Sequence, residues 1–373
     1  MQKVAVIPGD GIGPEVVKEA RRAIDAVSER HGLDMDFEEF PLGAGHYLRT
    51  GEVLSDETIA RLEGKDAILL GAMGDPRVKP GILEKGVLLR LRFHFDQYVN
   101  LRPVRLMEGV PCPLVGSGRK VDMHFVRENT EDFYVGIGGR VGDGRSRKEL
   151  ELVRKAYEVK FDVGLDVKGA GELAFQIGVI SRKGADRVVD FAFKMAKEKG
   201  VDLVTSVDKA NVLTDVYGLW REAVERAAAR YGIAREFQYV DAVALHMVRT
   251  PERFKVLVTP NLFGDILTDL GAAIQGGLGF APSGNINPEG ISMFEPVHGS
   301  APDIAGKGLA NPVGAVLSAA LMLENLGHKG AAADIERAVA EVLRGGLHRT
   351  ADIGGSTSTS QMGDAILKEL KKG

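Results

Sequence analysis

Short apolar runs alternate with helical repeats along the first part of the chain. Strands are predicted at Lys3–Pro8, Met35–Phe40 and Ala67–Leu70, where apolar residues are continuous or alternate. Between them, apolar residues recur at helical spacing in Pro14–Arg30 and Asp56–Leu62. This strand-helix-strand-helix-strand order indicates a parallel sheet covered by helices, which is the α/β class.

The middle of the chain has a different pattern, because strand-like segments follow one another there. These segments are Met123–Val126, Glu151–Val163 and Leu173–Ile180, and the Gly- and charge-rich stretch 138–171 is interpreted as an arm or mobile surface insertion. Elsewhere helices and strands alternate again. Helices are predicted at Val87–Phe95, Arg187–Lys199, Val216–Tyr231, Pro312–Gly327 and Ala331–Leu343. An extended segment is predicted at Tyr98–Pro103, and strands at Asp202–Val207, Phe237–Val240 and Val256–Thr259. We therefore predict a domain built from both termini (residues 1–99 and 276–373) with a second domain (100–275) inserted, carrying an arm near 138–180.

The bulk composition is ordinary for a globular protein. Of the 373 residues, 44% are hydrophobic and 27% charged, and the net charge is only −4. No basic stretch is both long and aromatic, which argues against nucleic acid as a partner, and no apolar run reaches the roughly 18 residues that cross a membrane. The start of the chain lacks a signal-peptide pattern, and the one cysteine, Cys112, excludes an internal disulfide. We expect a cytoplasmic protein with neither nucleic acid nor membrane as a partner.

The segment Asn261–Asp269 carries a pair of aspartates. Read as a helix that opens after Gly264, it places Asp265 and Asp269 on one face, because positions four apart are neighbours. Two like charges repel each other unless a cation lies between them, and carboxylate oxygens suit Mg2+ or Mn2+. The other interpretation is a solvated acidic face on an ordinary helix.

Five further residues are candidates for chemistry. Guanidinium groups clamp carboxylates in a bidentate fork, so Arg92, Arg102 and Arg127 would suit a substrate with two carboxylates if they converge. Unrelated surface arginines are the alternative. Tyr134 and Lys209 are candidate proton donors or bases, because burial or a nearby cation tunes such groups, although most such residues are structural.

The first strand and the first helix are joined by a glycine-rich loop, Gly9–Glu15. A dinucleotide-binding fingerprint would fall at this place in the chain. The glycines run G-x-G-x-G rather than G-x-G-x-x-G, so the standard match fails. A tight turn and a close backbone approach to a ligand remain possible, but the loop does not indicate a Rossmann domain.

Several long segments resemble the β-decarboxylating dehydrogenases, the family of isocitrate and 3-isopropylmalate dehydrogenases. Phe294–Pro312 resembles the nucleotide loop of that family, and the other matching segments follow in family order: Gly9–Glu15, Asn100–Pro103, Arg127–Tyr134, Lys209–Leu213 and Asn261–Asp269. The resemblance covers nearly the entire chain. It implies the two-domain, non-Rossmann fold of this family, with a parallel or mixed central sheet and an inserted dimerisation domain.

The resemblance also implies roles for individual residues. Arg92, Arg102 and Arg127 would hold the carboxylates of a 2-hydroxy acid, and Mg2+ or Mn2+ would be held by Asp241, Asp265 and Asp269. Asp241 would also lie against the substrate. Lys209 would assist removal of the hydroxyl proton, and Tyr134 would protonate the product enol. Because family members contribute the equivalents of Lys209 and Asp241 to the neighbouring subunit's site, a homodimer with shared active sites is expected.

The expected cofactor is NAD. The carboxylate of Asp303 would accept hydrogen bonds from the ribose hydroxyls and would repel a 2′-phosphate. By resemblance, the cofactor contacts are Glu295, His298, Gly299, Ser300, Ala301, Asp303, Ile304 and Asn311.

The substrate is less sharply indicated than the family. Gly81–Phe93 resembles the substrate-selecting segment of some bacterial isopropylmalate enzymes, in which Leu88 and Leu89 would cover an isopropyl group. D-malate and tartrate dehydrogenases resemble the neighbouring segments too, and isocitrate or homoisocitrate dehydrogenases belong to the same family. A non-catalytic regulatory subunit is the alternative from another class, but it should have lost part of the metal or proton-transfer set. Two residues depart from the family pattern: Asp132 replaces a usual glycine, and Asp208 replaces a usual histidine and adds a negative charge beside Lys209.

Overall fold

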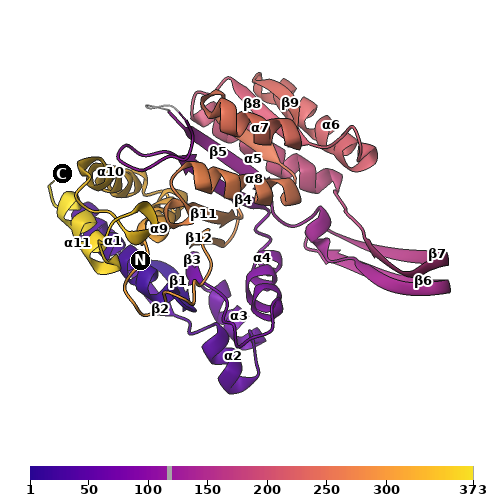
Figure 1. Cartoon of the computed structure of the whole chain (residues 1–373), viewed down its shortest axis with the longest axis horizontal. Helices are drawn as coiled ribbons and strands as arrows, with labels where there is room; N and C mark the ends of the chain where they lie inside the picture. Colours follow the sequence, from indigo (N-terminus) through magenta and orange to yellow (C-terminus); the bar gives the residue numbers. More distant parts are fainter. Residues whose placement is uncertain (116–119, 373) are drawn as a thin grey trace. The chain divides into compact units, whose positions relative to one another are not determined.

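The computed structural model describes residues 1–115 and 120–372. Contacts within the chain divide it into two compact units. Unit 1 comprises Met1–His124, His246–Phe254 and Thr268–Gly373, and unit 2 comprises Phe125–Leu245 and Lys255–Leu267. The elements of each unit are labelled in Figure 1.

Unit 1 is built on a mixed sheet. Its strands lie in the order β2-β1-β3-β12-β11-β4, namely Met35–Glu39, Gln2–Gly9, Ala67–Ala72, Ser292–Pro296, Pro282–Ile286 and Val99–Arg105. The first four strands pair in parallel, whereas β11 is antiparallel to both of its neighbours. The predicted α/β class with a parallel or mixed sheet is confirmed. β3 is buried along its whole length, as expected for a strand covered on both faces.

The helices of unit 1 pack on that sheet. They are α1 (Gly13–His31), α2 (Ala44–Thr50), α3 (Asp56–Glu63), α4 (Arg90–His94), α9 (Val313–Asn325), α10 (Lys329–Gly345) and α11 (Thr359–Leu370). The first eleven residues of α9 are all buried, because α9 packs against α1, α10 and β12. The C-terminal α11, yellow in Figure 1, lies beside the indigo α1 near the start of the chain. Both ends of the chain therefore contribute to one core.

The strands of unit 2 lie in the order β5-β10-β8-β9. These strands are Asp122–Glu128, Val256–Thr259, Leu203–Asp208 and Ala234–Tyr239. β10, β8 and β9 are parallel. The helices that lie wholly or partly in unit 2 are α5 (Arg182–Glu198), α6 (Thr214–Tyr231), α7 (Val240–Arg249) and α8 (Asn261–Ile274). Trp220 and Tyr217 on α6 are fully buried and form part of the core of unit 2.

A long antiparallel hairpin, β6 (Gly138–Arg154) and β7 (Tyr157–Gln176), belongs to unit 2 and forms the two long magenta strands in Figure 1. The predicted strand Glu151–Val163 is wrong, because the hairpin turn at residues 155–156 interrupts it. The pairing shifts register between Gly142 and Gly144. Leu152 packs with hydrophobic residues that precede the hairpin, and Arg154 Nε donates to the Thr130 carbonyl at 2.8 Å. The turn end of the hairpin therefore contacts the segment that leads into it.

Several boundaries differ from the predictions. The helix that carries the two aspartates begins at Asn261, not after Gly264, so Gly264 lies inside it. A Cβ at Gly264 would lie 2.3 Å from Thr259 Oγ1 and 2.6 Å from Arg127 Cγ, so the glycine allows this close approach. The predicted helix Val87–Phe95 begins instead with a π-helical turn, η1 (Glu84–Leu89), followed by α4.

Other elements were not predicted at all. They are α2, α7, α11, β11 and β12. β11 has the sequence PSGNI, which is poor in strand-forming residues and depends on its two neighbouring strands. No helix in the described part of the chain is long and apolar enough to cross a membrane.

Candidate active site

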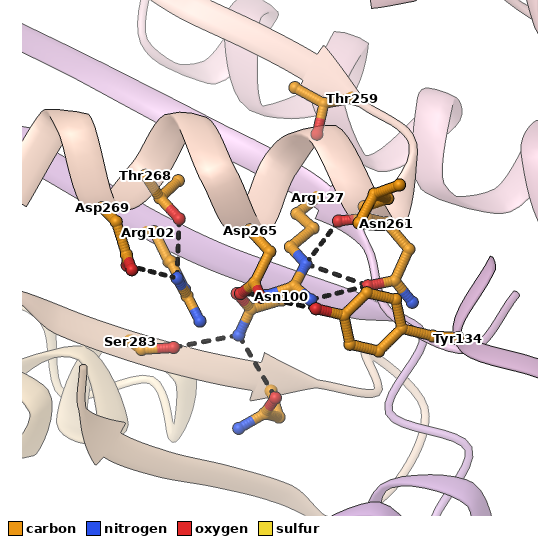
Figure 2. Close-up of polar contacts among 12 residues, drawn as sticks. Asn100, Arg102, Arg127, Tyr134, Thr259, Asn261, Asp265, Thr268, Asp269 and Ser283 are labelled. Atoms are coloured by element: carbon orange, nitrogen blue, oxygen red, sulfur yellow. Dashed lines mark hydrogen bonds and ion pairs between the residues drawn. The ribbon is translucent and has the colours of Figure 1, made fainter. Parts of the chain in front are cut away.

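Three predicted site residues come together in unit 2: Arg127 on β5, Tyr134 on the short 3-10 helix η2 (Phe133–Val135) and Asp265 on α8. The Tyr134 hydroxyl donates to Asp265 Oδ2 at 2.5 Å, and Arg127 Nη1 forms an ion pair with Asp265 Oδ1. Figure 2 shows these side chains pointing toward one another. The Arg127 guanidinium also lies 5.2 Å from the centre of the Tyr134 ring. A positive charge, a carboxylate and a phenol therefore form one compact cluster.

Asn261, the first residue of α8, holds Arg127 in place. Arg127 Nε donates to the Asn261 carbonyl at 2.9 Å, and Nε and Nη2 donate to Asn261 Oδ1 at 3.0 and 2.7 Å. Arg127 is only 1% exposed, and a buried guanidinium needs such partners. Asn261 was not among the predicted site residues, and its place at the head of the aspartate segment was the only sequence signal.

Three buried carboxylates, those of Glu128, Glu131 and Asp132, lie in the segment between Arg127 and Tyr134. Glu128 accepts from the Thr130 amide and hydroxyl at 2.7 and 2.8 Å, and Glu131 accepts from the Ser181 amide and hydroxyl at 2.8 and 2.6 Å. Burial, and then the charge of Glu128, raises the pKa of Glu131 to about 7. Burial likewise raises the pKa of Asp132 to about 6, although its hydrogen bond from the Leu262 amide opposes the shift.

A second group of predicted residues lies in unit 1. Arg102 on β4 donates from Nη1 to Thr268 Oγ1 at 2.6 Å, and the same nitrogen is 3.8 Å from Asp269 Oδ1 (Figure 2). Nearby on β4, the amide of Asn100 donates to Ser283 Oγ at 2.9 Å. Arg92 lies on α4 and is almost fully buried. Arg92 and Arg102 are thus held by unit 1, whereas Arg127 is held by unit 2.

Asp265 and Asp269 lie one turn apart on α8, with side chains 38% and 67% exposed. Each carboxylate faces an arginine, so its negative charge is partly balanced. Exposed carboxylate oxygens are the hard donors that Mg2+ and Mn2+ take, so the pair fits such an ion. Among the described residues, however, no three Asp, Glu, His or Cys side chains gather as a metal-binding group. Within the described residues, Asp241 therefore does not join Asp265 and Asp269 in such a group.

Asp241 instead forms an ion pair with Lys209 in unit 2. Lys209 directly follows β8, and Asp241 lies in the first turn of α7. The hydrogen bond from Lys209 lowers the pKa of Asp241. The neighbouring Asp208 is fully buried and accepts from Arg221 Nε at 2.6 Å and Nη2 at 2.9 Å. The extra negative charge of Asp208 is therefore balanced by Arg221.

The predicted nucleotide loop follows β12 in unit 1. Glu295 accepts from the Asn285 amide at 2.7 Å, and Asn311 donates to Asp352 at 2.9 Å. His298 is 9% exposed, and burial lowers its pKa, so the ring is neutral near pH 7. The rest of the predicted set lies in the same stretch of chain, namely Gly299, Ser300, Ala301, Asp303 and Ile304.

The glycine-rich loop before α1 supports this nucleotide loop. The Ile12 amide donates to the Ser300 carbonyl at 2.9 Å. A Cβ at Gly11 would lie 1.9 Å from that carbonyl oxygen, so only glycine permits the contact. Glu15 accepts from the amides of Gly306 and Gly308 at 2.5 and 3.1 Å. The G-x-G-x-G pattern therefore serves contact between two loops.

The two leucines of the predicted substrate-selecting segment lie in and at the end of the π-helical turn. Leu88 packs against the unit 1 core cluster that contains Val87 and Leu91. Leu89 is partly buried and immediately precedes α4. One of the two leucines is thus partly engaged in core packing.

Comparison with known proteins identifies the family of the chain. Residues 3–366 match the family described as "Isocitrate/isopropylmalate dehydrogenase". A protein named 3-isopropylmalate dehydrogenase from Thermobifida fusca is 50% identical over 99% of this chain and 97% of its own length, and one of the same name from Leifsonia xyli is 47% identical over 98% and 97%. The crystal structure of isocitrate dehydrogenase from Methylococcus capsulatus is 35% identical, covers all of both chains and has a TM-score of 0.84. The chain therefore belongs to the isocitrate/isopropylmalate dehydrogenase family.

Proposed function

We propose that this chain is an NAD-dependent 3-isopropylmalate dehydrogenase of leucine biosynthesis. It would oxidise and decarboxylate (2R,3S)-3-isopropylmalate to 4-methyl-2-oxopentanoate and CO2. The observation that carries the proposal is the 50% identity, over almost the whole of both chains, with a relative of that name. The proton-transfer and carboxylate candidates Tyr134, Lys209, Asp241, Asp265 and Asp269 are all present, which argues against a non-catalytic regulatory subunit.

The site residues fit the chemistry that this reaction requires. The three arginines supply positive charge for the two substrate carboxylates, and Lys209 is a candidate base for the C2 hydroxyl proton. Tyr134 is a candidate acid for C3, because its hydroxyl proton is directed by Asp265 and lies beside the Arg127 charge. When bound, Mg2+ or Mn2+ on the aspartates would polarise the substrate oxygens and NAD would accept the hydride.

We assign the cofactor to unit 1 and to the loop after β12. Glu15 accepts hydrogen bonds from two backbone amides of this loop, and the Ile12 amide donates to the Ser300 carbonyl of the loop. The loop is therefore held in place by α1 and the turn that precedes it. In the same stretch, the carboxylate of Asp303 favours the free ribose hydroxyls of NAD over a 2′-phosphate.

We further propose a homodimer, in the cytoplasm, in which Lys209 and Asp241 enter the partner's site. Large apolar side chains are exposed in unit 2, among them Val212 just after Lys209, Leu245 on α7 and Ile266 on α8. Exposed apolar residues near candidate site residues suit an interface. The α8 carboxylates also lack a third metal ligand within the described residues of one chain.

Isocitrate is the second candidate substrate, favoured by the similarity to the Methylococcus capsulatus enzyme. The test follows NAD reduction with Mg2+ or Mn2+ and compares kcat/KM for 3-isopropylmalate, isocitrate, homoisocitrate, D-malate and tartrate. We expect 3-isopropylmalate to be the best substrate. A higher kcat/KM for any of the others would reject the proposed substrate while keeping the family.

A further inference from the structure

We propose that Asp132 is a positioning residue that fixes Tyr134 against Asp265. The inference rests on the proposed function, because it takes Tyr134 as the proton donor. Asp132 stands between the end of β5 and the turn that presents Tyr134, and it is fully buried.

The carboxylate of Asp132 ties this turn to the start of α8. Oδ2 accepts from the Leu262 amide at 2.9 Å, and Oδ1 accepts from the Tyr217 hydroxyl at 3.2 Å. The first amides of a helix have no partner inside the helix, so an outside acceptor fixes where the helix begins. The Tyr217 ring also contacts Phe263, the next residue of α8, with 5.4 Å between ring centres. Asp132 and Tyr217 therefore hold the first turn of α8 together.

The same turn and the same helix are joined a second time at the candidate active site. Tyr134 follows Asp132 by two residues, and Asp265 follows Leu262 by three, which is about one helical turn. Between them runs the Tyr134–Asp265 hydrogen bond of 2.5 Å. A third link runs from the Asn261 side-chain amide to the Glu131 carbonyl at 3.3 Å. The position of the phenol relative to the carboxylate thus depends on links made outside the reacting groups.

The backbone conformation of Asp132 supports a specific role for its side chain. Its φ is +62°, in the region that favours glycine, and Asp132 is one of three non-glycine residues with positive φ in the described chain. Glycine would adopt this conformation more easily but has no carboxylate. The backbone is independently held, because the Asp132 amide donates to the Val179 carbonyl at 2.7 Å and the Asp132 carbonyl accepts from the Val179 amide at 3.3 Å. Asp132→Gly therefore removes the side-chain links while the backbone pairing stays available.

The first test measures the tether directly, in enzyme without substrate. We expect amide hydrogen exchange at Leu262–Asp265 to become about tenfold faster in Asp132→Gly, because Leu262 loses its acceptor. Asp132→Asn keeps one carbonyl oxygen and tolerates positive φ, so its exchange rate should lie between those of wild type and Asp132→Gly. Unchanged exchange at Leu262 in Asp132→Gly would overturn the inference.

The second test measures turnover of 3-isopropylmalate. Asp132→Gly should lower kcat about tenfold or more while the KM for NAD stays within about twofold, and Asp132→Asn should recover most of the loss. The matched control is Asp143→Gly, which removes another aspartate that accepts two backbone amides, those of Ala170 and Gly171, in the exposed hairpin. Its kcat should match the wild type. Equal kcat in Asp132→Gly and wild type would reject the positioning role.

A double-mutant cycle distinguishes positioning from general damage. If Asp132 acts through Tyr134, adding Asp132→Asn to Tyr134→Phe should change kcat less than about twofold. An Asp132→Asn effect as large in that background as in wild type would contradict the inference and leave the proposed function standing. If wild type turns over none of the five substrates, the proposed function fails and the inference fails with it.

Discussion

The two candidate proton-transfer residues differ in how many contacts hold them. Tyr134 belongs to the compact cluster, in which Arg127 is 1% exposed and Asp265, although 38% exposed, is bonded on both oxygens. Lys209 pairs with Asp241, and these side chains are 29% and 66% exposed. A network anchored on a buried arginine by several hydrogen bonds is fixed before ligands bind, whereas a single ion pair with an exposed partner is weak and easily rearranged. One part of the candidate site is therefore preorganised, whereas the other part can rearrange.

The largest effect is expected at the compact cluster. Asp265→Asn should lower kcat by at least about a thousandfold and weaken Mn2+ binding, because it removes a charged oxygen donor and changes the partner of Tyr134. The fold should remain, as judged by circular dichroism. Titration calorimetry measures the affinity for Mn2+ separately from turnover. Asp265→Asn with wild-type activity would show that the metal assignment is wrong.

The Lys209–Asp241 pair gives the sharper test of whether two subunits share each active site. Lys209→Met and Asp265→Asn should each be inactive alone. If each site takes Lys209 from the partner, a hybrid dimer of the two variants contains one intact site, so a random mixture should regain about a quarter of wild-type activity. Co-expression with two different tags would isolate the hybrid. No recovered activity would place Lys209 and Asp265 of each site on the same chain.

The exposed apolar residues should matter less for chemistry than for assembly. Leu245→Glu on α7 should raise the dimer dissociation constant roughly 10- to 100-fold, because it places a charge in the proposed interface. Leu347→Glu is a matched control, since Leu347 is an exposed leucine in unit 1. Analytical ultracentrifugation over a range of concentrations would compare the two. Equal dissociation constants would contradict the proposed interface.

The same contrast explains what the sequence alone could predict. The spacing of Asp265 and Asp269 is a local property of a helix, so their shared face followed from the pattern. The roles of Asn261 and Asp132 depend on contacts between segments more than 120 residues apart and on a positive φ, which no local pattern reveals. For the same reason β11 was missed, because its neighbours stabilise it despite its weak propensity. Sequence patterns therefore predict most helices and strands and the aspartate pair, whereas tertiary contacts determine which side chains interact.

The smallest expected effect concerns stability at the buried carboxylates. With a folded pKa of about 7 against an ordinary value of 4.5, Glu131 keeps its proton in the folded state at pH values where the unfolded chain has lost it. The folded state then binds more protons, so the free energy of unfolding should fall as pH rises from about 4.5 to about 7, by roughly 1–3 kcal/mol. The raised pKa of Asp132 should lower the free energy of unfolding in the same direction as pH rises from its ordinary value of 3.8 to about 6.

Urea unfolding at several pH values measures how steeply the free energy of unfolding falls with pH. The fall should be flatter in Glu131→Gln than in wild type, whereas Glu158→Gln on the exposed hairpin should leave it unchanged. A slope as steep in Glu131→Gln as in wild type would mean that this buried carboxylate does not hold its proton, and the turn beside Tyr134 would then be charged throughout the working pH range.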